Sequence, residues 1–315
     1  SLVDATQGVQ LPIILSAGGD RLNLYALAWF AYALRTTGAH GVTCDSEVLE
    51  RMSQMDELAT LILRSPADPD SLLEADLIGS TLAVKADALA NILKHEPGLS
   101  TTDAIRVLGL HLGFAFRLAH VPLPLVSTSR LASPPIEIYA NVVRRHLDSE
   151  GHSDVSIIPS SVDADATTVE AAWPARPHPR TLSVIIPTLA GGDDVLELVT
   201  SIRQHAMKPE SLEIIVIDNG CTPQAAAPLR ELRRSGRIRL LEAAKPFNWA
   251  HVNNCAAAEA TGDALVFMND DMRMLSPGWD DRVRGHLGRR CVGAVGAKFL
   301  YPHGLIQHAG ILVGW

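Results

Sequence analysis

The segment Ser183-Val-Ile-Ile-Pro-Thr188 decides the fold of the second half of this chain, because it is a short apolar run that ends in a polar residue. Two later segments repeat this order, Glu213-Ile-Ile-Val-Ile-Asp-Asn-Gly220 and Ala264-Leu-Val-Phe-Met-Asn-Asp-Asp-Met272. Strands buried on both faces of a parallel sheet read as continuous apolar runs, and ligands collect at their carboxyl ends. The three segments therefore predict a parallel α/β sheet with a nucleotide and metal site at its strand ends.

Helical patterns alternate with these runs, as expected for a Rossmann-like sheet. Asp193 and Asp194 are predicted to cap the first of the helices, in which apolar residues recur at helical spacing. The expected elements, in chain order, are strand 184–187, helix 193–202, strand 214–217, a helix through 229–232, strand 238–241, helix 250–260 and strand 265–268.

Five short motifs occur in order between residues 179 and 315. They are Ile185-Ile-Pro-Thr188, Val216-Ile-Asp-Asn-Gly220, Pro246-Phe-Asn-Trp249 with Asn253-Asn254, Asn269-Asp-Asp271, and Gly293-Ala-Val-Gly-Ala-Lys298 with Tyr301-Pro302 and Ile306-Gln-His-Ala-Gly310. In this order they resemble the front half of a family 2 glycosyltransferase with the GT-A fold. The triplet at 269–271 stands as a variant of that family's DXD motif.

The resemblance implies transfer of a sugar from a nucleotide-diphosphate donor with the help of Mg²⁺ or Mn²⁺. Charge builds on the leaving diphosphate during such a transfer, and a divalent ion held by oxygen ligands neutralises it. By resemblance Asp271 binds the metal, with Asp270 as a further ligand, while Asn269 and Asp270 face the ribose and the diphosphate. The alternative is that 269–271 is a solvated turn, since Asn and Asp are common turn formers.

The resemblance also implies a wider set of donor contacts. The residues expected at the nucleotide sugar are Pro187, Thr188, Asp218, Asn219, Asn248, Asn254, Asn269, Asp270 and His308. Structural alternatives remain open for two of them: Asp218 can cap a turn with Asn219-Gly220, and Asn248 can cap a helix. Asn254 is ranked above Asn253 as a ligand.

The function implied is that of an inverting enzyme of bacterial surface polysaccharide synthesis, acting on a glycan or lipid-linked acceptor. The acidic general base of such enzymes lies in the back half of the domain, so we expect it beyond Trp315 and assign no catalytic residue here. The chain lacks an initiating Met and stops in the apolar run 311–315, and it reads as a fragment of a tandem protein.

Residues 1–160 are expected to be a degenerate back part of a preceding GT-A-like domain, joined by a Pro-rich linker at 161–180 to the nucleotide-sugar-binding part at 181–315. The order of residues 11–20 parallels that of 265–271, which indicates a weak internal repeat. Gly18-Gly19-Asp20 stands where more carboxylates are expected, and Thr101-Thr102-Asp103 stands where the acidic pair that includes the base is usual.

Composition limits the partners and the compartment. A net charge of −8 and a pI near 5.8 argue against a nucleic-acid partner. The four cysteines form no Cys-x-x-Cys pair and are predicted to be buried thiols in the cytoplasm. A basic run at residues 230–239 predicts a solvated helix face, with peripheral association at an inner membrane as a minor possibility.

Three alternatives to a complete enzyme domain follow from the same residues. One is a non-catalytic binding or scaffolding module. Another is a nucleotidyltransferase, which would usually carry a basic residue in a Gly-rich loop after the first strand, where only Gly191-Gly192 occurs. The last is that the two halves complete one permuted domain and share a single sheet.

Overall fold

The computed structural model describes residues 12–51, 57–64, 68–96, 98–128, 136–159, 168–189, 191–243 and 246–310. They form two compact units that divide between Ala172 and Trp173. This division falls inside the segment predicted as a linker. Within that segment residues 161–167 lie outside the described residues, and Val169–Ala172 forms a strand, β8, of the first unit.

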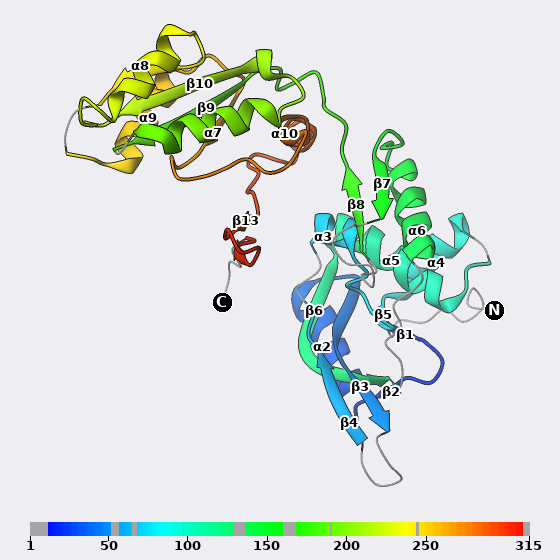
Figure 1. Ribbon diagram of the computed structural model, residues 1–315. Coiled ribbons are helices and arrows are strands. Elements are labelled where there is room, and N and C mark those ends of the chain that lie inside the picture. The colour runs from blue at the N-terminus through cyan, green and yellow to red at the C-terminus, as the bar shows by residue number, and fades with distance from the viewer. Residues whose placement is uncertain are drawn as a thin grey trace. The chain divides into compact units, whose positions relative to one another are not determined.

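The second unit contains a parallel sheet with the strand order β11-β10-β9-β12. Its strands are β9 (Leu182–Thr188), β10 (Leu212–Asp218), β11 (Arg239–Glu242) and β12 (Ala264–Phe267). Its helices are α7 (Gly192–Gln204), the short 3-10 turn η1 (Pro209–Ser211), α8 (Ala226–Arg234), α9 (Trp249–Glu259) and α10 (Trp279–Leu287). In Figure 1, β9 and β10 run side by side with α7 along them.

Alternation along the strands sorts their side chains onto two helix layers. Val184 and Ile186 of β9 face one way and pack with apolar residues of α7, α8 and α10. Ile185 faces the other way and packs with Val252 and Ala256 of α9. The central strands are therefore buried on both faces, which explains why β9 and β10 read as continuous apolar runs.

The strands and helices predicted between residues 184 and 268 are all present, with two corrections. The N-cap of α7 is Gly191 and no side chain caps this helix, so Asp193 and Asp194 lie in its first turn instead. The strand at 264–267 is not fully buried: Leu265 and Phe267 are 39% and 46% exposed. Among the described strands β12 pairs only with β9, so it is an edge strand, and Leu265 and Phe267 lie on the face that is not fully covered.

The strand order creates a switch point between β9 and β12. β10 and β11 lie on one side of β9, whereas β12 lies on the other, and ligands of open α/β sheets bind where the order reverses in this way. Met268 donates its amide to the Ile185 carbonyl at 3.0 Å, so the backbone of Ile185 faces the β12 side of the sheet. Because backbone groups two residues apart in a strand point the same way, the nitrogen of Pro187 also faces that side. Pro187 has no N–H to donate to the chain that follows β12, which ends at Phe267.

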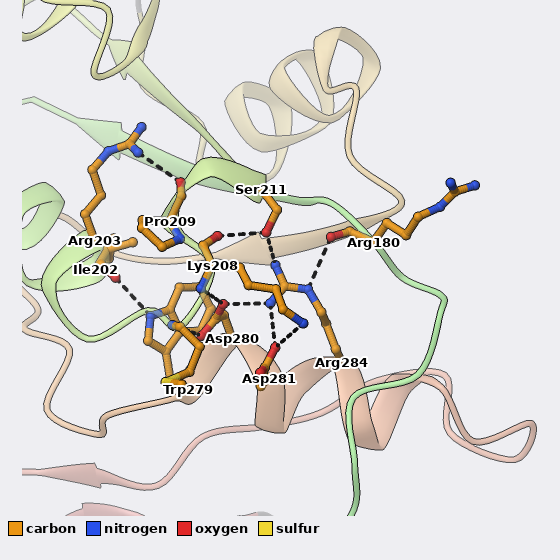
Figure 2. Close-up of polar contacts among 11 residues, drawn as sticks. Arg180, Ile202, Arg203, Lys208, Pro209, Ser211, Trp279, Asp280, Asp281 and Arg284 are labelled. Atoms are coloured by element: carbon orange, nitrogen blue, oxygen red, sulfur yellow. Dashed lines mark hydrogen bonds and ion pairs between the residues drawn. The ribbon is translucent and has the colours of Figure 1, made fainter.

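The amino end of this sheet is held by a buried ion pair on α10 (Figure 2). Asp280 accepts the amides of Met207 and Lys208 at 2.8 and 3.0 Å and the Arg284 guanidinium at 2.6 Å. Arg284 also donates to the carbonyl of Arg180 at 3.2 Å. α10 is thereby fixed to the residues that precede β9 and β10.

The first unit is built on a six-stranded mixed sheet of its own, with the order β1-β5-β3-β6-β2 and β4 paired to β3. Its strands are β1 (Ile13–Ser16), β2 (Arg21–Leu22), β3 (Gly41–Arg51), β4 (Glu57–Ile62), β5 (Thr81–Val84), β6 (Leu118–Thr128), and a separate hairpin of β7 (Ser156–Pro159) and β8. Its helices are α2 (Ala26–Thr37), α3 (Pro69–Glu74), α4 (Ala86–His95), α5 (Thr101–Phe114) and α6 (Ile136–Ser149). The described strands of the two units form separate sheets, which is contrary to the permuted-domain alternative.

The acids singled out in the first unit are occupied by internal contacts. Asp20 accepts hydrogen bonds from the hydroxyls of Ser16 and Thr81 at 3.5 and 3.3 Å. Asp103 and Ser100 form a reciprocal N-terminal cap of α5, in which the Asp103 amide donates to the Ser100 hydroxyl at 3.1 Å. The assignment of this unit to the back half of a GT-A-like domain remains a prediction.

Two expectations from composition can be compared with the fold. The prediction of four buried thiols is wrong for Cys255 and Cys291, which are exposed, whereas Cys44 is buried and Cys221 is half-buried. Cys255 lies on the outer face of α9, whose sheet side is packed by Val252 and Ala256. Within the described part of the chain, no helix has the length and apolar character needed to cross a membrane.

Candidate functional site

The carboxyl ends of β9, β10 and β12 bring predicted site residues together. Asp218, the last residue of β10, is in register with Thr188, the last residue of β9. Across the switch point the Thr188 hydroxyl donates to Asp270 Oδ2 at 2.6 Å. Residues that lie 82 positions apart in the sequence thus meet at one edge of the sheet, as the three strand-end motifs predicted.

Thr188 holds its position through contacts on both sides. It is 1% exposed, and its Oγ1 accepts the amide of Gly191 at 2.8 Å while donating to Asp270. Gly191 has φ of +58°, and a Cβ there would lie 2.7 Å from the carbonyl oxygen of Ala225. From the sequence alone, Gly191 is recognised only as part of a Gly-rich loop, yet the tight turn that orients Thr188 requires a glycine at this position.

Asp218 performs the turn-capping role that was its structural alternative. Its Oδ1 accepts the amides of Gly220 and Cys221 at 2.9 and 2.7 Å. Burial raises the pKa of Asp218, but these hydrogen bonds outweigh burial and lower the pKa below its ordinary value. The side chain is therefore an ionised acceptor at neutral pH, and its Oδ2 is oriented by a rigid turn.

Asn219 is the most unusual residue at this edge. It is 1% exposed, and within the described chain neither its side-chain oxygen nor its side-chain nitrogen has a hydrogen-bond partner. Its backbone amide donates to the Thr188 carbonyl at 3.0 Å, which fixes the residue beside the end of β9. A buried amide without partners costs about 1–3 kcal/mol of folding free energy.

The Asn269-Asp270-Asp271 segment follows β12 as a turn. Asp270 is half-buried and held by Thr188, whereas Asn269 and Asp271 are exposed. The Asp271 carboxylate has neither a hydrogen bond nor an ion pair with any residue that the structure describes. The turn therefore leaves one positioned and one open carboxylate at the switch point, a donor set of oxygens that suits Mg²⁺ or Mn²⁺.

Helix α9 assigns different roles to its three asparagines. Asn248 is its N-cap, since Asn248 Oδ1 accepts the amide of His251 at 2.9 Å. Asn254 is exposed. Asn253 is 2% exposed, donates to the carbonyl of Trp249 at 2.7 Å, and leaves its buried Oδ1 unpaired among the described groups. The ranking of Asn254 above Asn253 as a ligand remains a prediction, and Asn253 has the unused buried oxygen.

His308 is not brought to the strand ends by any contact among the described residues. It lies in β14 (Ile306–His308), which pairs with β13 (Phe299–Leu300) in a small hairpin. Its ring centroid is 5.7 Å from that of Phe299. A role for His308 at the donor remains a prediction.

The strand order, the helices on both sheet faces and the acidic and amide groups at the switch point define a Rossmann-like α/β unit. Residues 183–304 match the family model described as "Glycosyl transferase family 2". This part of the chain is therefore similar to family 2 glycosyltransferases.

Curated relatives extend the match over more of the chain. The chain is 30% identical over 257 residues to "O-antigen biosynthesis protein RfbC" of Myxococcus xanthus, a match that covers 78% of this chain and 20% of that protein. It is 34% identical over 190 residues to "Uncharacterized protein y4gI" of Sinorhizobium fredii, covering 59% and 21% respectively. The matched region thus spans about a fifth of the length of these relatives.

Solved structures give a more distant likeness. A mannosyltransferase from Pyrobaculum calidifontis, in complex with GDP-Man and Mn²⁺, is 22% identical with a TM-score of 0.36, and the match covers 42% of this chain and 39% of that one. TarS 1-349 of S. aureus is 22% identical with a TM-score of 0.27, covering 29% and 27%.

Proposed function

We propose that the second unit binds a nucleotide-diphosphate sugar together with Mg²⁺ or Mn²⁺. The observation that carries this proposal is the pairing of Asp270 with Thr188 across the switch point, which leaves Asp271 open beside it. Asp271 and Asp270 would hold the ion, which when bound neutralises charge on the leaving diphosphate. No other arrangement of the described strand ends offers two adjacent carboxylates.

The chain's own residues would divide the work of binding. Thr188 restrains the Asp270 carboxylate, so that less side-chain freedom is lost when the ligand arrives. The ionised Asp218 accepts hydrogen bonds from a base or ribose, and the buried Asn219 amide gains the partners that it lacks in the free unit. Pro187 would line the rim of the base pocket.

We further propose that the whole protein is an inverting glycosyltransferase of bacterial surface polysaccharide synthesis, acting on a glycan or lipid-linked acceptor. The relative named as an O-antigen biosynthesis protein supports this process, although the match covers only a fifth of it. A cytoplasmic location with peripheral association at the inner membrane belongs to the same proposal. The second unit supplies donor binding, and the general base is sought outside its described residues.

Particular residues and contacts bear on two alternatives, the nucleotidyltransferase and the non-catalytic module. A nucleotidyltransferase phosphate loop is disfavoured because the first turn of α7 carries Asp193 and Asp194, which repel phosphate at a helix N-terminus. A non-catalytic role is favoured for the first unit alone, because Asp20 and Asp103 are already used in internal hydrogen bonds.

Calorimetric titration of the chain with UDP, GDP and dTDP sugars, with and without Mn²⁺, tests donor binding. We expect one class of donor to bind in a Mn²⁺-dependent way, and the Asp271→Ala variant to lose this binding. The Asp281→Ala variant is the matched control, since Asp281 is an acid of α10 that contacts Lys208 and Arg284 instead of the strand ends. Binding that is equal in both variants would refute the assignment.

A further inference from the structure

A second cluster of metal-ligating groups lies in the first unit, where the ends of α5 and α6 meet. His111 is in the last turn of α5, His146 is in the last turn of α6, and Glu150 follows directly after α6. One ligand atom from each of these residues lies within 4.8 Å of the other two. The His111 and His146 ring centroids are 4.8 Å apart and the rings meet edge to face.

His146 provides an independent observation that the cluster is incomplete. The residue is 4% exposed, and neither ring nitrogen has a hydrogen-bond partner within the described chain. Its ring also packs against Phe114, with centroids 4.5 Å apart. A buried imidazole ordinarily pairs at least one nitrogen. His146 Nδ1 and Nε2 are therefore both available to a ligand.

The groups around the cluster favour a bound metal cation. Helix C-termini carry partial negative charge, and both histidines lie in such last turns. His111 is half-buried and His146 is buried, and a neutral imidazole presents one nitrogen lone pair that can coordinate a metal ion. Glu150 is exposed, which supplies an anionic ligand and a path from solvent.

We propose that His111, His146 and Glu150 bind a Zn²⁺ ion at the junction of α5 and α6. Two imidazoles and one carboxylate form a known type of zinc ligand set, which leaves a position for water. Ligand atoms around tetrahedral zinc lie about 3.3 Å apart, from bonds of about 2.0–2.1 Å, so small side-chain rotations close the observed spacing. The ion would join α5 to α6 and satisfy the buried His146.

Zn²⁺ calorimetry near neutral pH, with Co²⁺ absorption as a check on coordination, tests the site in the full chain. We expect one Zn²⁺ per chain, with affinity reduced at least about 100-fold by His111→Gln and at least about tenfold by Glu150→Gln. Both residues lie at the surface side of the cluster, so these variants avoid the folding risk of replacing His146. The bound ion should also raise the midpoint of thermal unfolding, and His111→Gln should abolish that increase.

Three controls separate this site from other groups that could take zinc. His95→Gln alters a nearby histidine that bonds the Asn91 carbonyl, and it should leave affinity unchanged. Cys255→Ser removes a thiol 3.7 Å from His251 Nε2, and Asp271→Ala removes the proposed donor-site ligand; neither should reduce binding. Zinc binding that survives His111→Gln, or that disappears with Cys255→Ser, would overturn the proposal.

Discussion

The two ends of the parallel sheet in the second unit differ in how fully particular polar side chains are hydrogen-bonded. At the amino end, Glu213 accepts from the Ser183 hydroxyl at 2.5 Å, from the Thr261 amide at 2.8 Å and from Arg239. Asp263 there accepts the amides of Arg180 and Thr181. At the carboxyl end, Asn219 is buried without side-chain partners and Asp271 is open.

This difference suggests that polar groups at the amino end stabilise the fold, whereas those at the carboxyl end serve ligand binding. Polar groups with all their partners hold strands and helices together, because each replaces the hydrogen bonds lost to burial. Buried polar groups left without partners lower stability, and at the carboxyl end we propose that the donor supplies the missing partners. Changes at the amino end should therefore unfold the unit, whereas changes at the carboxyl end should weaken donor binding.

The largest effect is expected from Asp280→Ala, which leaves the buried Arg284 guanidinium without its main partner. Breaking a buried pair in this way costs about 3–5 kcal/mol of unfolding free energy. Urea unfolding measures the loss. Asp281→Ala, in which a partly exposed partner of the same arginine is removed, should cost about 0–1 kcal/mol. Similar losses in the two variants would show that Asp280 does not anchor α10.

Asp271→Asn should reverse that pattern, with a large loss of binding and no loss of stability. We expect Mn²⁺-dependent donor affinity to fall at least about 100-fold, or about 2.8 kcal/mol, because a metal ligand loses its charge. The unfolding free energy should stay within about 0.5 kcal/mol of the parent, as for other exposed sites. Calorimetry and urea unfolding of the same preparation check both halves of this prediction, and a marked destabilisation would contradict it.

Glu213→Gln should give a pH-dependent loss at the amino end. Burial raises the pKa of Glu213, but the hydrogen bonds from Ser183, Thr261 and Arg239 outweigh burial and lower the pKa to about 2. A lowered folded-state pKa stabilises the protein above the unfolded-state value of 4.5, and that stability is lost as pH falls toward about 2.

At neutral pH the Gln variant should be less stable by about 1–2 kcal/mol, below the full linkage value because the carboxylate is partly solvated. The difference between parent and variant should shrink as pH is lowered from about 5 to about 3. Urea unfolding over that range measures it. A difference that stays constant with pH would mean that the ionised carboxylate is not what stabilises this end.

The smallest effect is expected from Asn219→Ser, and its sign is informative. Replacing a buried amide without partners by a smaller hydroxyl should leave stability unchanged or raise it by up to about 1 kcal/mol. Donor affinity should nevertheless fall about tenfold, because a ligand hydrogen bond is lost. Cys255→Ser, at an exposed position of α9, serves as the control for both measurements. A loss of stability in Asn219→Ser alone would assign this residue to the structure instead of the site.

The sequence allowed the strands and their polar ends to be predicted because apolar runs and their boundaries are local signals. It predicted the meeting of Thr188 with Asp270 only through the rule that parallel strand ends share one edge. The capping of α7 was wrong because the tight turn at Gly191 depends on the Ala225 carbonyl, which is remote in sequence. The half-exposed β12 was missed because an apolar strand reads the same whether or not its second face is covered.

Other features depend on three-dimensional contacts that no short motif records. The Asp280–Arg284 pair lies on one helix, but its importance comes from the amides of Met207 and Lys208. His111, His146 and Glu150 fit no local metal-finger spacing, because two helices bring them together. The unpaired amide of Asn219 likewise follows from burial, which a sequence of common turn residues does not reveal.

One measurement tests the contrast between open and occupied acids most directly. It is the number of nucleotide-dependent Mn²⁺ ions bound per chain, followed by electron paramagnetic resonance with UDP, GDP or dTDP in the parent, Asp271→Asn and Asp20→Asn proteins. Asp20 is the matched acid, since its segment parallels 265–271 in sequence but its carboxylate is held by Ser16 and Thr81. We predict one such ion in the parent and in Asp20→Asn, and none in Asp271→Asn. An ion that remains in Asp271→Asn, or that disappears in Asp20→Asn, would contradict the account.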